Sequence, residues 1–128
     1  MAARPNSFDD WFRHEFGAGG AFTALIVLFA IDEQTARPLR SSHVHVIGDA
    51  LDWSAMEALL DGGGSDWDAV LFSPRRDPRD GGVIGDTAAR QDLAEHVEAI
   101  VADRSLLNQG HFFDRKGRRL RIDEVAAQ

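Results

Sequence analysis

The feature that most constrains the fold is an unbroken apolar run from Leu25 to Ile31, inside the stretch Ala21–Asp32. Glycines precede this stretch and a polar segment follows it, so turn-forming residues lie at both ends. A short apolar run bounded in this way predicts a core strand that is buried on both faces. The run is too short for a transmembrane helix, which needs about 18 apolar residues or more.

Composition limits the class of protein. The chain has 128 residues, of which 44% are hydrophobic, enough for a core, so we expect a single domain over residues 1–128. It has no cysteine, which excludes disulfides and thiolate metal sites. The net charge of −7 disfavours nucleic-acid binding, because contacts to phosphates need excess cations. Lys116 is the only lysine, a bias typical of some bacterial proteins, and we expect a cytoplasmic protein that does not bind membranes.

The N-terminal segment over residues 7–17 predicts an amphipathic helix. Ser7 is a suitable N-cap, and acidic residues in the first turn favour the positive end of the helix dipole. An aromatic stripe recurs at helical spacing and is formed by Phe8, Trp11, Phe12 and Phe16. We expect this stripe to pack on the sheet, with a partner or dimer surface as the alternative.

The remaining residues, 21–123, predict an α+β core. After the first strand, a polar connection over Asp32–Pro38 leads to a second strand over Ser41–Ile47, in which Val44 and Val46 face one side and His43 and His45 the other. A short helix follows, with Ser54 as its cap and Glu57 completing a capping box. Residues 67–72 predict a third strand. Residues 87–107 predict the longest helix, whose buried stripe comprises Leu93, Val97, Ile100, Val101 and Leu107.

The chain ends in a predicted hairpin, in which His111–Phe113 pairs with Arg118–Ile122 around a turn with Gly117. The whole pattern predicts a single-layer, mixed, mostly antiparallel sheet of about five strands packed by three helices, in the order α-β-β-α-β-α-β-β. The strand–helix–strand unit around Ser54 predicts one parallel crossover in that sheet.

His43 and His45 are the clearest candidate metal ligands. Two histidines two residues apart on a strand point to the same face and can share one divalent transition-metal ion. Asp49, Asp32 or His111 are the candidates for a third ligand. The alternative is that both histidines lie on a solvated sheet face without a metal.

The long connection Ser73–Asp86 is a candidate anion site. It leaves a buried strand and enters a helix, and Arg75, Arg76 and Arg79 could hold a carboxylate or a phosphate group. Acidic residues in the same segment nearly cancel this charge. The alternative is therefore a self-paired surface loop.

An acidic stretch over residues 49–68 contains six acids and no cation. Such a surface favours association with a basic protein. Basic residues cluster on the terminal hairpin, where they could contact the acidic stretch of a second copy. We predict a protein-binding surface comprising Asp49, Asp52, Trp53, Asp61, Asp66 and Trp67.

The leading hypothesis is therefore a small acidic protein that binds another protein, as an inhibitor or immunity-like module or as a homo-oligomeric adaptor, without being an enzyme. The first alternative is a metal-dependent or ligand-binding enzyme that uses His43 and His45. The second alternative is an anion-binding module. We expect no cofactor apart from a divalent metal under the first alternative, because the chain has no phosphate-loop, zinc-protease or serine-elbow motif.

Overall fold

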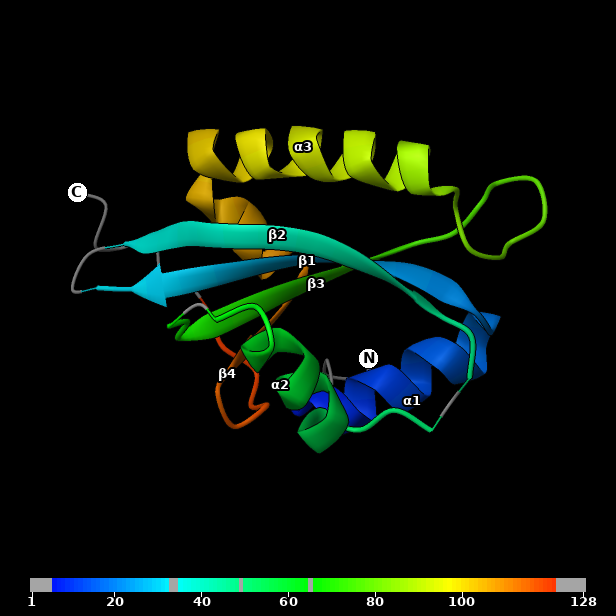
Figure 1. The fold of residues 1–128 in the computed structure, drawn as a ribbon, viewed down its shortest axis with the longest axis horizontal. Helices are drawn as coiled ribbons and strands as arrows, with labels where there is room; N and C mark the ends of the chain where they lie inside the picture. The colour runs from blue at the N-terminus through cyan, green and yellow to red at the C-terminus, as the bar shows by residue number, and fades with distance from the viewer. Residues whose placement is uncertain (1–5, 33–34, 49, 65, 122–128) are drawn as a thin grey trace.

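The computed structural model describes residues 6–32, 35–48, 50–64 and 66–121. Within these ranges the chain forms three α-helices, one short 3₁₀-helix and one four-stranded sheet (Figure 1). This is the α+β fold that the sequence predicts. In chain order the elements are α1 (Phe8–Gly19), β1 (Phe22–Ile31), β2 (Ala36–Val46), α2 (Trp53–Asp61), β3 (Ala69–Arg75), α3 (Asp86–Ala102), η1 (Arg104–Asn108) and β4 (His111–Asp114).

The sheet is entirely antiparallel, with the strand order β2-β1-β3-β4. The prediction of a mixed sheet with one parallel pair of strands is therefore wrong. The two strands joined by α2 do run in the same direction, but β1 lies between them, so they never pair. The sheet is open, and β2 forms one of its edges (Figure 1).

The predicted fifth strand is replaced by isolated bridges. After β4 the chain reverses at Gly117, which has a φ of +75°, and the amide of Asp114 donates to the carbonyl of Arg118 at 2.9 Å. The amide of Leu120 donates to the carbonyl of Phe112 at 2.8 Å. The predicted turn is confirmed, but residues 118–121 of its second arm form only isolated bridges and no regular strand, and Ile122 lies outside the described residues.

Each face of the sheet carries its own hydrophobic core. The helices α1 and α2 cover one face and α3 covers the other (Figure 1). In β1, Ala24 and Ile26 point towards α1 and α2, whereas Leu25 and Val27 point towards α3. The prediction that this strand is buried on both faces is confirmed.

The helix α1 packs on the sheet through its aromatic stripe, as predicted. Phe8, Trp11 and Phe12 are at most 2% exposed, and Phe16 packs partly buried against the same core. The hydroxyl of Ser7 accepts a hydrogen bond from the amide of Asp10 at 3.2 Å, so the predicted N-cap is also confirmed.

Two predicted helix boundaries are wrong. Asp52, not Ser54, caps α2, because its carboxylate accepts the amide of Ala55 at 2.9 Å. The longest helix ends at Ala102, because Asp103 has an extended backbone and caps the 3₁₀-helix η1 that follows.

The predicted buried stripe of α3 is only partly correct. Leu93 and Ile100 are buried and Val97 packs against the same core, whereas Val101 is 53% exposed. Val101 follows Ile100 directly, and one residue rotates a helix by about 100°, which turns this side chain to solvent. Leu107 is buried as expected, but it belongs to η1.

None of the helices within the described ranges is long and apolar enough to cross a membrane.

Candidate metal centre

The strand β2 places His43 and His45 on the side of the sheet that α3 covers. Their partners on β1 are Leu25 and Thr23, and Leu25 belongs to the core beneath α3. Val44 and Val46, between and after the histidines, pack into the opposite core. The predicted alternation of this strand is therefore confirmed.

Asp86 is the first residue of α3, and it completes the group. Its Oδ1 atom lies 2.6 Å from Nε2 of His45 and 3.1 Å from Nε2 of His43. One ligand atom from each of the three residues can be chosen so that all three lie within 4.8 Å of one another. The helix α3 thus places a carboxylate beside a histidine pair that lies more than forty positions earlier in the chain.

The group lies at the rim of the sheet and is open on one side. The side chains of His43 and His45 are 17% and 31% exposed, and that of Asp86 is 63% exposed. Hydrogen bonds from His45 and then from His43 lower the pKa of the Asp86 carboxyl below its ordinary value. At neutral pH this group is therefore an ionised carboxylate, the form that binds a metal.

Thr23 holds the other side of the His45 ring. Its side chain is fully buried, and its Oγ1 atom lies 2.9 Å from Nδ1 of His45 and accepts the amide of Ile84 at 3.0 Å. With Nε2–H donating to Asp86, Nδ1 accepts the threonine hydroxyl. When Nε2 instead binds a metal, Nδ1–H donates to the same oxygen, an outer contact that fixes the orientation of metal-binding histidines.

The distances suit a small divalent ion. Zinc binds imidazole nitrogen at about 2.0–2.1 Å, so neighbouring ligand atoms in a tetrahedral site are about 3.4 Å apart. The two contacts of Asp86 would each lengthen by less than about 1 Å to reach that spacing. Two nitrogens and one oxygen leave the remaining coordination positions to water or to a substrate.

The third ligand differs from those that the sequence suggested. Asp49 lies outside the described residues. His111 stacks on Trp11 of α1, at 4.7 Å between ring centres, and so lies on the opposite face of the sheet. Asp32 follows the far end of β1, away from Thr23. At the level of sequence, Asp86 is only one of the acidic residues of the connection Ser73–Asp86 and is not predicted as a metal ligand. No local pattern indicates that the start of α3 lies beside β2.

The three arginines of the predicted anion site do not converge. Arg75 and Arg76 are neighbours at the end of β3 and point to opposite faces. Arg75 donates to Asp92 of α3 at 2.9 Å, whereas Arg76 binds the Glu15 side chain of α1. Arg79 is 90% exposed in the loop.

Several residues of the predicted protein-binding surface have partners within the chain. Asp61 pairs with Arg115 at 2.9 Å and accepts the indole N–H of Trp67 at 3.0 Å. Trp67 is only 1% exposed, and Trp53 is half-buried and donates from its indole to the Arg115 carbonyl at 3.0 Å. Asp52 caps α2, and Asp66 is exposed.

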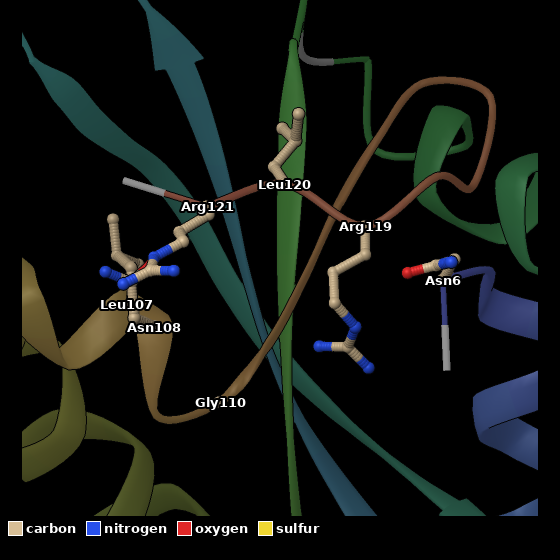
Figure 2. A pocket seen from close by; sticks show the side chains of 7 residues that line it. All are labelled: Asn6, Leu107, Asn108, Gly110, Arg119, Leu120 and Arg121. Atoms are coloured by element: carbon tan, nitrogen blue, oxygen red, sulfur yellow. The ribbon is translucent and has the colours of Figure 1, made fainter. Parts of the chain in front are cut away.

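A cavity of about 460 Å³ lies where η1 meets the segment after Gly117 (Figure 2). Arg119 and Arg121, from the basic part of the terminal segment, both line it. Among the described lining residues there is no histidine or carboxylate, so this cavity offers no metal ligands of the kind found at Asp86. The lining residues are Asn6, Leu107, Asn108, Gly110, Arg119, Leu120 and Arg121.

The geometry around His43, His45 and Asp86 thus provides the metal-ligand group of the described chain. Its donors are two imidazole nitrogens and one carboxylate oxygen, held by β2 and α3. Comparisons of the chain with protein-family models, with curated proteins and with solved structures find no match.

Proposed function

We propose that this protein binds one divalent transition-metal ion through Nε2 of His43, Nε2 of His45 and the carboxylate of Asp86. The observation that carries the proposal is the convergence of both imidazoles on one carboxylate oxygen, at 3.1 and 2.6 Å. A histidine pair alone is common by chance. A third ligand brought from a distant helix to the same point is a much more specific arrangement.

The donor set indicates which metals fit. Imidazole nitrogen favours zinc, iron, copper and nickel over magnesium and calcium, which prefer oxygen ligands. Two histidines and one carboxylate with open positions are found in hydrolytic zinc sites and in non-haem iron sites. The proposed ion would therefore bind and polarise a further ligand in addition to its three protein ligands.

The metal proposal has more support than the protein-binding function expected from the acidic stretch. Trp67 is inside the core and Asp61 is paired with Arg115, so these two residues contribute to the fold of the chain itself. Protein binding through the exposed acids stays a prediction. The metal site, in contrast, rests on three side chains that already face one another.

Metal titration tests the proposal directly. Protein without a histidine tag, treated with chelator and then dialysed against Zn²⁺, is expected to bind one ion per chain. The double variant His43→Ala/His45→Ala should lose this ion, because a lone carboxylate binds zinc weakly. Asp86→Asn should weaken binding by at least about tenfold, since it removes an anionic ligand.

His14→Ala provides the matched control. His14 lies exposed on α1, so its removal should leave the stoichiometry and the affinity unchanged. The proposal fails when wild-type protein binds no zinc, or when the double histidine variant binds it as tightly as the wild type does.

A further inference from the structure

A second polar group lies on the same face of the sheet, on the other side of β1. Leu25 pairs with His43 on β2 and with Ser73 on β3, so Ser73 also points towards α3. With β1 between them, β2 and β3 are about 10 Å apart. The group around Ser73 is therefore separate from the metal ligands.

Ser73 and His96 form a hydrogen-bonded pair. The Oγ atom of Ser73 lies 2.8 Å from Nε2 of His96, which belongs to the middle of α3. Ser73 is only 4% exposed. A serine oxygen in contact with an imidazole nitrogen has the geometry of a nucleophile and its general base.

The surroundings of His96 favour the neutral imidazole. Burial is the largest influence and the positive charge of Arg75 is the next, and both lower the pKa of His96, against a smaller opposite effect of Asp92. At neutral pH the ring is thus uncharged and able to accept the proton of Ser73.

The pair faces a cavity of about 410 Å³ between β3, α3, η1 and β4. Pockets that bind small molecules measure about 300–1,000 Å³. Arg75 lines the same cavity, and its guanidinium donates from Nε to Asp92 and from Nη1 to the Pro74 carbonyl. Among the described residues its Nη2 group has no partner, which leaves N–H donors for an oxygen that gains negative charge.

We propose that Ser73 is a nucleophile, with His96 as its general base, and that this cavity binds a small carboxylic ester. The alternative is a structural role, in which Ser73 bonds to His96 because a buried hydroxyl needs a hydrogen-bond partner. The cavity in front of the pair and the arginine beside it are what favour the catalytic interpretation.

The proposed reaction has two steps, the acylation of Ser73 and the hydrolysis of the acylated serine. Ser73 Oγ bonds to the carbonyl carbon while its proton passes to His96 Nε2, and Arg75 stabilises the carbonyl oxygen. The ester C–O bond then breaks, and His96 returns the proton to the departing alcohol. Water next attacks the acylated serine, with His96 as base again, and releases the carboxylic acid and free Ser73.

A fluorophosphonate probe tests the nucleophile without a known substrate. The folded protein is expected to form one adduct, which peptide mapping by mass spectrometry should place on Ser73. Labelling should be abolished in Ser73→Ala and slowed about 100-fold or more in His96→Gln. Its rate should rise with pH through one inflection below about 6.5, the ordinary histidine pKa, as His96 loses its proton near Arg75 and Asp92.

Ser42→Ala is the matched control, because Ser42 lies exposed on β2 and its loss should not change labelling. Treatment with a chelator should also leave labelling unchanged, which separates this inference from the metal proposal. An adduct on any serine other than Ser73, the absence of an adduct on wild-type protein, or equally fast labelling of heat-denatured protein would each overturn the inference.

Discussion

Gly117 occupies a position where two separate constraints exclude a side chain. Its φ of +75° lies in the left-handed region, which costs other residues about 1–2 kcal/mol. A Cβ atom at this position would also lie 2.9 Å from the ring of Trp53. The carbonyl of Gly117 in turn accepts the amide of Phe8 at 2.8 Å, so the turn is fastened to the start of α1.

We therefore expect Gly117→Ala to lower the free energy of unfolding by about 2–4 kcal/mol, as the sum of backbone strain and a forced shift of Trp53. The control is Gly81→Ala, at a φ of +76° with no atom near its Cβ position. It should cost only about 1–2 kcal/mol. Urea denaturation measures both values. Equal decreases in the free energy of unfolding would show that Trp53 can shift without destabilising the protein.

At the scale of the elements, α2 depends on the side chain that begins it. The carboxylate of Asp52 accepts the amide of Ala55, and the amide of Trp53 donates to Asp9 of α1 at 2.7 Å. The start of α2 is therefore held by its own cap and by a neighbouring helix. Ser54 lies one residue inside the helix, where its hydroxyl cannot act as the N-cap.

Asp52→Ala is expected to destabilise the protein by about 1 kcal/mol, the usual cost of losing an N-cap. Asp52→Asn keeps an acceptor oxygen and should cost less, and it also separates the cap from any role of this charge in binding a partner. Ser54→Ala should stay within about 0.5 kcal/mol of the wild type. Thermal and urea unfolding check the order, and a Ser54→Ala loss equal to that of Asp52→Ala would contradict this cap.

At the scale of the whole molecule, the proposed metal would join two elements that the chain keeps far apart. Its ligands come from β2, at the edge of the sheet, and from the first turn of α3. An ion bound only by the folded state stabilises that state by mass action. The site is disrupted when α3 leaves the sheet, because Asp86 then separates from His43 and His45.

Zn²⁺ at a free concentration 100 times its dissociation constant should therefore raise the free energy of unfolding by about 2.7 kcal/mol. Mg²⁺ should have no comparable effect, because it prefers oxygen ligands and octahedral geometry. Thermal denaturation with and without the ion measures the change. The same zinc effect in the His43→Ala/His45→Ala variant would place the ion elsewhere on the protein.

Local sequence patterns were sufficient for most of the fold. The apolar run of β1, the aromatic spacing of α1 and the glycine of the last turn each act over a few neighbouring residues, and each led to the observed element. At the start of α2 the sequence pattern was ambiguous, because Asp52 and Ser54 are both suitable N-cap residues. The prediction of Ser54 was wrong, since Asp52 is the N-cap in the structure.

The sequence by itself determined that β2 presents His43 and His45 on one face, because side chains alternate along any strand. Only the tertiary structure decided that Asp86 is their partner, that His96 reaches Ser73, and that β1 separates β2 from β3. Each of these depends on how α3 lies across the sheet. That placement is set by the burial of Ala89, Leu93 and Ile100 in the core that α3 shares with the sheet, where α3 contacts β1 and β2, a sum of many weak contacts that no short motif encodes.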